Sequence, residues 1–324
     1  MERTTAKKNK YEIDMCNGTI MDKLISFSLP LMLSGILQLM FNAVDIIVVG
    51  RFSGSQALAA VGSTSALINV FTNLFIGISL GANVLTARFY AAGREKEVSE
   101  TVHTAITLAL VSGIVMALVG LVFSKGALAL MGTPDDVIGL SALYMRIYFL
   151  GMPFFMLYNY GAAILRAVGD TKRPLLFLMI AGVINACLNM VLVIVFKLGV
   201  AGVAIATVIS QMISCVLVLR CLCRSESSYR LRFSELGMKG YYLKQIFSVG
   251  IPAGIQSTVI NFSNVLLQSS VNSFGSTAMA GYTAANNLLG FLYVSVNSIT
   301  QACMSFTSQN YGVGKLKRMD HVLA

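Results

Sequence analysis

The chain has 324 residues, of which 56% are hydrophobic and only 12% are charged. Soluble domains carry roughly 25% charged residues, so this composition excludes an ordinary soluble globular protein and predicts one embedded in a lipid bilayer. The formal net charge of +10 would suit a nucleic-acid partner. The basic residues are, however, scattered through the short polar segments between long apolar runs, and we expect no nucleic-acid surface.

Taken in chain order, the apolar runs predict an all-α membrane protein with eight transmembrane helices. Each run reaches the length of about 20 residues that crosses the hydrocarbon core, and none shows the alternation of a barrel strand. The predicted spans lie near residues 24–50, 56–88, 99–124, 137–165, 174–197, 200–222, 245–272 and 277–311.

The charged segments between the spans divide the chain into four parts. We predict a cytoplasmic tail at 1–23, an N-terminal six-helix lobe at 24–222, a cytoplasmic loop at 223–244, and the first two helices of a truncated C-terminal lobe at 245–324. Most Lys and Arg residues fall on one side when the N-terminus is placed inside, as the positive-inside rule requires. The expected location is therefore the plasma (inner) membrane, with several passes and a cytoplasmic N-terminus.

Residues 24–97 recur weakly at 246–318. Pro30 matches Pro252, and further pairs such as Tyr90 and Tyr311 match at an offset of 221. Six spans separate the starts of the two copies, so both copies run in the same direction and the repeat is parallel. Two six-helix lobes would make twelve spans, of which this chain would hold eight. Such a duplicated membrane unit is the usual architecture of a secondary transporter.

Apart from Glu100 at the edge of the third span, Asp45 is the only acidic residue inside any predicted span. A charged side chain at the centre of a bilayer costs at least about 2.5 kcal/mol, and such residues mark ion or proton handling. Transfer out of water disfavours the ionised carboxylate, so protonation of Asp45 can be coupled to a conformational change. The alternative is a structural carboxylate that only hydrogen-bonds a neighbouring helix.

Polar side chains line one face of two predicted spans. The first stripe comprises Ser34, Gln38, Asn42 and Asp45, and the stripe of the seventh span comprises Ser257, Asn261, Asn264, Gln268 and Asn272. The members of each stripe are three to four residues apart, which places them on one helical face. A single amide in a span often only joins helices, whereas two stripes indicate a water-filled cavity. Amide walls with one carboxylate suit an organic or cationic substrate better than an anion.

Motifs for catalysis, nucleotide binding and metal binding lack the required context. Residues 77–81 spell G-x-S-x-G, but they lie in the middle of a span with no preceding strand, and a catalytic triad is not expected. Residues 312–315 lack the spacing of a phosphate-binding loop. The six cysteines predict neither a disulfide nor a metal site. We therefore expect no enzyme and no cofactor apart from a coupling ion.

Five stretches form specific local patterns that together cover the chain from about residue 20. They are Asp45 followed by Gly50, Gly54, Ala57 and Ala60; Tyr90-Ala91-Ala92-Gly93; the segment from Tyr144 to Ile147 with Pro153; Arg166-Ala167-Val168-Gly169-Asp170-Thr171-Lys172-Arg173-Pro174; and Asn185-Ala186-Cys187-Leu188-Asn189 leading to Gly199-Val200-Ala201-Gly202. These patterns resemble the multidrug and toxic compound extrusion (MATE) family of transporters.

The resemblance implies two six-helix lobes, alternating access, and export of cationic or amphipathic compounds against inward H⁺ or Na⁺. By position, Asp45 resembles the coupling carboxylate of the family, and the polar residues around it in the first-lobe cavity are matched by Gln38, Asn159, Asn185 and Thr207. In one H⁺-linked branch an aspartate stands where this chain has Asn189. In another branch the seventh helix carries a glutamate, which this chain lacks. The ion therefore stays open between H⁺ and Na⁺.

The leading hypothesis is a secondary active transporter that exports cationic or amphipathic drugs in exchange for H⁺ or Na⁺. Its predicted ion-coupling residue is Asp45, and its predicted cavity-lining residues are Gln38, Asn42, Asn159, Asn185, Asn189, Thr207, Asn261, Asn264 and Gln268. The expected partners are the lipid bilayer and a small organic substrate, and we expect a monomer. The alternatives are a flippase for a lipid-linked saccharide and, less favoured, a membrane protein that does not transport.

Overall fold

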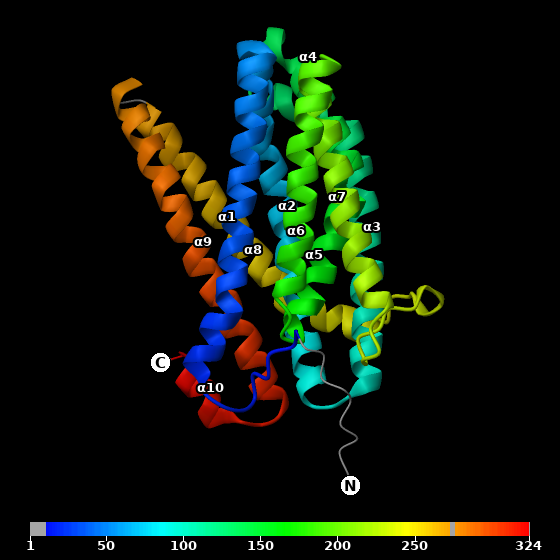
Figure 1. The fold of residues 1–324 in the computed structure, drawn as a ribbon. Helices are drawn as coiled ribbons and strands as arrows, with labels where there is room; N and C mark the ends of the chain where they lie inside the picture. Colours follow the sequence, from blue (N-terminus) through cyan, green and yellow to red (C-terminus); the bar gives the residue numbers. More distant parts are fainter. Residues whose placement is uncertain (1–10, 273–275, 324) are drawn as a thin grey trace.

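The computed structural model describes the backbone of residues 11–272 and 276–323, which is helical throughout apart from its connections (Figure 1). The α-helices are α1 (Ile20–Phe52), α2 (Gly54–Ala91), α3 (Glu95–Leu130), α4 (Asp135–Leu150), α5 (Met152–Ala167), α6 (Lys172–Asn189), α7 (Gly199–Cys223), α8 (Gly240–Asn272), α9 (Ser276–Gly312) and α10 (Leu316–Leu323). A π-helical segment, η1 (Met190–Val195), continues α6, and a short 3₁₀ turn, η2 (Phe233–Glu235), lies between α7 and α8. The prediction of an all-α protein is confirmed for the described residues.

Five of the described helices are long and apolar enough to cross a membrane, and six spans result if the bent pair α4 and α5 counts as one. These five helices are α1, α2, α3, α6 continued by η1, and α7. The six agree with the six spans predicted for the N-terminal lobe. The helices α8 and α9 were not among those that met this criterion within the described residues, so their crossing of the membrane stays a prediction.

The predicted span at 137–165 is two helices that meet at 48° around Gly151. Pro153 stands in the first turn of α5, where its missing N–H costs nothing, but the same residue could not continue α4. Gly151 itself packs tightly, since a Cβ there would lie 2.7 Å from the Gln211 side-chain oxygen. Gly151 and Pro153 therefore account for the bend, although hydropathy alone predicts one continuous span here.

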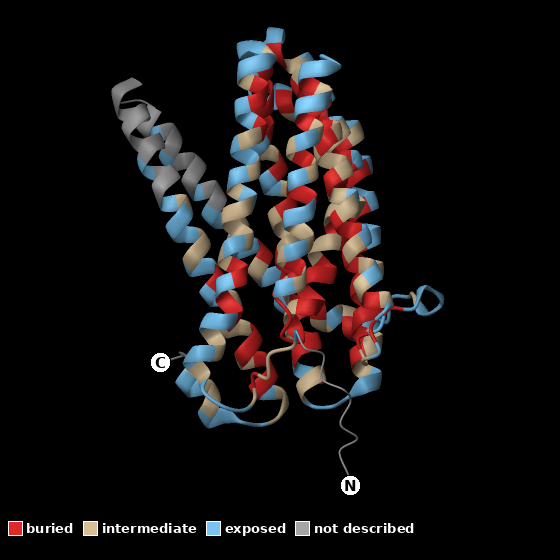
Figure 2. Ribbon diagram, in the orientation of Figure 1, coloured by how far each residue is buried: buried red, intermediate tan, exposed pale blue. Residues whose placement is uncertain are grey.

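The helices α1 to α7 form one bundle with a dense apolar centre, shown red in Figure 2. Phe149, Met156 and Tyr160 are fully buried there, where α3, α4, α5 and α7 meet. Large apolar side chains also cover the outer surface, with Val122 68% exposed and Leu130 92% exposed. An apolar exterior of this kind is unfavourable in water and favourable against lipid.

The two copies of the repeat fold alike. The helices α1 and α8 each have 33 residues and each contain a proline near the start, at Pro30 and Pro252. The helices α2 and α9 have 38 and 37 residues. Their packing is reciprocal, because α1 contacts α9 while α2 contacts α8. Reciprocal contacts are those of a twofold relation between the copies.

Glycines set the distance between α2 and α8. A Cβ on Gly77 would lie 2.2 Å from the Cα of Gly254, and a Cβ on Gly81 would lie 2.1 Å from the Ile246 carbonyl oxygen. A Cβ on the facing glycine Gly250 would lie 2.5 Å from the Cα of Ile78. Membrane helices that approach this closely gain van der Waals contact that larger residues would prevent. This junction is where the first bundle holds the second copy.

We predict that Gly77→Ala destabilises the protein, because the added methyl group meets backbone atoms that have no rotamer to change. Overpacking of this kind costs about 1–3 kcal/mol. Gly62→Ala is the matched control on the same helix, since a Cβ there meets nothing within 4 Å. Thermal unfolding in detergent should show a lower midpoint for Gly77→Ala only. Equal midpoints for the two variants would contradict this account of the junction.

Candidate functional site

The buried carboxylate of Asp45 is hydrogen-bonded to a neighbouring helix. Asp45 lies on α1 and is 9% exposed, and the fully buried Asn189 at the end of α6 donates its amide N–H to the Asp45 carboxylate. The same Asn189 nitrogen is 3.2 Å from the side-chain oxygen of Asn185, one turn earlier. Asn185 in turn lies 3.5 Å from the hydroxyl of Thr207 on α7. The four residues thus connect α1, α6 and α7 in one polar chain.

Two tyrosines of α4 complete the surroundings of Asp45. The phenol groups of Tyr144 and Tyr148 both interact electrostatically with the carboxylate, and their rings stack with centroids 6.0 Å apart. Gln211 of α7 lies beside Tyr148. The prediction of cavity residues missed these tyrosines because an aromatic residue in a span usually belongs to the apolar core. Their spacing of four residues, on one helical face, is the signal that could have found them.

Asn189 also leaves one acceptor unused. Its side-chain oxygen is buried and has no hydrogen-bond partner among the described residues. Buried polar atoms without a partner are rare, and this one stands next to a carboxylate at the point where α6 gives way to the π-helical η1. Single π-helical turns often occur at functional sites. Oxygen acceptors grouped in this way suit a proton or a hard cation.

The other predicted cavity residues do not join this cluster. Gln38 and Asn42 are exposed on α1, which Figure 2 shows pale blue along much of its length. Asn159 is partly buried and donates to the carbonyl of Phe155 on its own helix, at 2.8 Å. The side chains of the seventh-span stripe, Asn261, Asn264 and Gln268, lie outside the described residues. The structure therefore groups Asp45, Asn185, Asn189 and Thr207. It places the other predicted residues of α1 and α5 away from this group, and it does not test those of the seventh span.

A second polar region lies at the end of the molecule where α10 and residue 11 are found (Figure 1). Residues 11–17, which we call the N-terminal strap, run across this end. The Glu12 carboxylate accepts hydrogen bonds from the hydroxyls of Tyr90 on α2, at 2.7 Å, and Tyr229, at 2.8 Å. The Met15 carbonyl accepts one from Asn310 on α9, at 3.2 Å. The strap therefore ties the first bundle to the second copy of the repeat.

The loop between α5 and α6 supports the strap. Gly169 has a φ of +97° and accepts a hydrogen bond from the Ile13 N–H, at 3.2 Å. A Cβ at Gly169 would lie 2.6 Å from the Ile13 carbonyl oxygen, so no larger residue fits. Asp170, fully buried, pairs with Arg173. Burial raises the pKa of the Asp170 carboxyl, and the Arg173 guanidinium opposes this shift.

Comparison with known proteins identifies related sequences and structures. The MatE family model matches residues 30–191 and 252–324. The chain is 35% identical over 306 residues to the probable multidrug resistance protein YoeA of Bacillus subtilis, covering 92% of this chain and 66% of that protein. It is 29% identical over 307 residues to the probable multidrug resistance protein YpnP of the same organism, covering 94% of this chain and 68% of that protein.

A solved structure shares the fold. It is an outward-facing conformation of a multidrug resistance MATE family transporter, and it superposes with a TM-score of 0.90 at 22% identity. The superposition covers 98% of this chain and 70% of the solved chain. Because the chain spans about two thirds of the relatives it matches, the remainder of their length has no counterpart in the described helices.

We predict an energetic coupling between Asp45 and Asn189 of about 1.5–3 kcal/mol, the range of hydrogen bonds to charged groups. Asn189→Leu removes the donor and leaves the carboxylate buried without a partner. The measurement is a double-mutant cycle of unfolding free energies in detergent, with Asp45→Leu and the double variant. Asn42→Leu, an exposed position on α1, is the control and should show no coupling to Asn189→Leu. Additive effects of the Asp45 and Asn189 changes would show that the contact carries no energy.

Proposed function

Because this chain belongs to the MATE family of membrane transporters, we propose that it acts in a secondary active transporter that exports cationic or amphipathic organic compounds in exchange for H⁺ or Na⁺. The observation that carries the proposal is the buried Asp45 carboxylate and its hydrogen bond from Asn189. One titratable group among otherwise neutral side chains gives a single place where an ion can bind. The names of the relatives, which describe multidrug resistance, support the substrate class.

The ion acts on the contact between α1 and α6. With Asp45 ionised, the Asn189 amide donates to a charged acceptor, and such bonds are roughly twice as strong as neutral ones. A bound proton removes the charge, and a bound Na⁺ competes with the amide for the carboxylate oxygens. Either event weakens the hold of α6 on α1. Pro30 inside α1 lacks a backbone N–H and provides a point at which that helix can bend.

Bending of α1 away from α6 also couples the ion to the substrate. The helices α8 and α9 lean away from α1 toward the end opposite α10 (Figure 1), while the strap and the α2–α8 glycines hold the copies together at the other end. We place the protein in the plasma membrane. The basic loops put the strap on its cytoplasmic side. In this arrangement the protein, acting as a monomer, is closed to the cytoplasm and faces outward. Release of the substrate outward and binding of the ion then belong to the same state.

Export of a cationic compound is favoured over flipping of a lipid-linked saccharide. A saccharide linked through phosphate is anionic and requires a cationic cavity. Among the basic residues of the first-lobe spans, Arg146 lies farthest from a span end, and it is exposed on α4. The described surroundings of the carboxylate consist of amides, a hydroxyl and phenols. Such groups accommodate a cation or an amphipathic neutral molecule.

We predict that Asp45→Asn abolishes ion-coupled export while leaving membrane insertion intact, because asparagine keeps the shape of the side chain and removes the group that binds the ion. The full-length protein would be reconstituted in proteoliposomes, and efflux of a fluorescent organic cation measured under a proton gradient alone and a sodium gradient alone. We expect at least a tenfold loss under whichever gradient drives the wild type.

Asp136→Asn is the matched control for that experiment. Asp136 lies in the exposed first turn of α4, so the same change of charge there should leave export at the wild-type rate. Export by Asp45→Asn at the wild-type rate would reject the assignment of the ion site. Absence of transport in the wild type under both gradients, with any organic cation, would instead reject the proposed function.

A further inference from the structure

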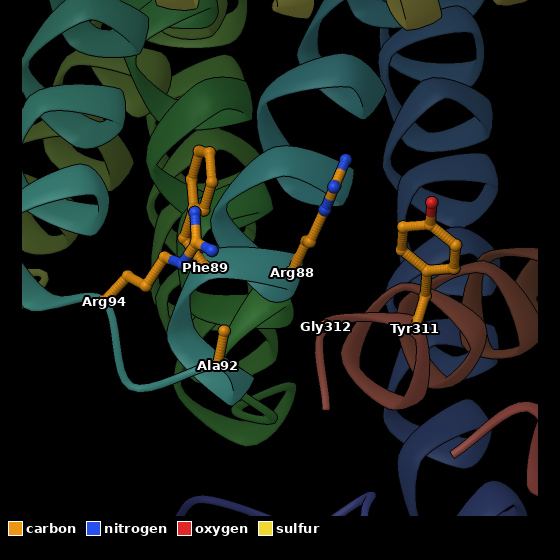
Figure 3. Close-up of a pocket in the computed structure, with 6 residues that line it drawn as sticks. All are labelled: Arg88, Phe89, Ala92, Arg94, Tyr311 and Gly312. Carbon is orange, nitrogen blue, oxygen red and sulfur yellow. The ribbon is translucent and has the colours of Figure 1, made fainter. Parts of the chain in front are cut away.

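A pocket opens at the strap end of the molecule, between the two copies of the repeat (Figure 3). It is lined by Arg88, Phe89 and Ala92 at the end of α2, Arg94 before α3, and Tyr311 and Gly312 at the end of α9. Its cavity volume is about 80 Å³. About 10–15 Å³ suffices for one water molecule, so the pocket has room for a small polyatomic group.

The pocket is cationic. Its two guanidinium groups belong to Arg88 and Arg94, and neither is ion-paired within the part of the chain that the structure describes. The Arg88 guanidinium lies 4.8 Å from the centre of the Tyr311 ring, so α9 contributes to its position. Gly312 brings the two helices into contact, because a Cβ there would lie 2.2 Å from the Arg88 carbonyl oxygen. Two uncompensated charges in a concave site attract anions.

The pocket residues can be compared with their counterparts in the other copy of the repeat. At the offset of 221, the counterparts of Tyr311, Arg94 and Phe89 are Tyr90, Lys315 and Asn310. All three counterparts donate hydrogen bonds to oxygen atoms of the strap. These are Tyr90 to the Glu12 carboxylate, Lys315 to the Cys16 carbonyl at 2.8 Å, and Asn310 to the Met15 carbonyl. The equivalent position in the other copy is therefore a site that receives oxygen acceptors, one of them an anion.

We propose that the pocket of Arg88 and Arg94 binds a phosphate group. Arginine offers planar paired donors that match the oxygens of a phosphate, and basic pockets between transmembrane helices on the cytoplasmic side bind anionic lipid headgroups. The phosphate comes from an anionic phospholipid of the adjoining leaflet or from free inorganic phosphate. Because the lining residues belong to both α2 and α9, the bound group also holds the two copies together at this end. This role is separate from that of Asp45.

Native mass spectrometry of the full-length protein in a neutral detergent tests the proposal. The protein would be titrated with phosphatidylglycerol, with phosphatidylcholine as the headgroup without net charge, and separately with inorganic phosphate. The first variant, Arg88→Gln with Arg94→Gln, removes both charges. The second, Ala92→Leu, fills the pocket and leaves the charges in place. The control, Arg224→Gln, removes an exposed charge at the end of α7, away from the pocket lining.

We expect wild type and control to bind phosphatidylglycerol alike, and both pocket variants to bind it about tenfold more weakly. A tenfold loss confined to inorganic phosphate would identify free phosphate as the ligand. Undiminished binding of both ligands by the pocket variants would overturn the proposal. So would a loss in the double-arginine variant that Ala92→Leu does not share, because the anion would then bind outside this pocket.

Discussion

The hydrogen bond from Asn189 to Asp45 is the interaction on which the proposed mechanism depends. A lone charge inside a membrane is costly, and a buried charge survives only when polar partners replace water. Asn189 supplies such a partner, and it is itself hydrogen-bonded to Asn185, which bonds Thr207 on the next helix. In the mechanism we propose, the position of α1 against α6 depends on the ionisation state of this one carboxylate, and the rest of the bundle forms an apolar frame around it.

The duplicated architecture contributes the frame but not the chemistry. Both copies have a proline in their first helix, and glycines bring α2 and α8 into backbone contact. At the sequence offset of 221, Asp45 falls opposite Leu266. The two copies also differ from each other at the strap end of the molecule. One is covered by the N-terminal strap, and the other forms the arginine pocket. Function is therefore expected at the places where the repeat is least symmetric.

Much of the fold follows from the sequence, because the spans, the direction of the repeat and the buried carboxylate depend on hydropathy and charge alone. Of the four residues that the family resemblance places around Asp45, Asn185 and Thr207 belong to the polar chain that reaches the carboxylate through Asn189, whereas Gln38 and Asn159 lie apart from it. Periodicity could not show that Gln38 and Asn42 lie on an exposed part of α1, because a helical face does not reveal which helix it meets.

Other features escaped prediction for different physical reasons. The strap is short and polar, and many of its hydrogen bonds are accepted by backbone carbonyls, which carry no sequence signal. The bend at Gly151 lies within a continuous apolar run, so hydropathy treats the two helices as one span. Tyr144 and Tyr148 have the apolar bulk of core residues, and only their hydroxyl groups relate them to Asp45. In each case the deciding contact is tertiary.

Ion exchange upon substrate binding tests the central claim most directly. The full-length protein in weakly buffered detergent solution would be mixed with an organic cation, and the release of H⁺ and of Na⁺ measured for wild type and Asp45→Asn. Our account predicts release of one of these ions by the wild type and none by Asp45→Asn, since the carboxylate is the group that holds the ion. Equal release by the two proteins would contradict the assignment of Asp45 as the site of exchange.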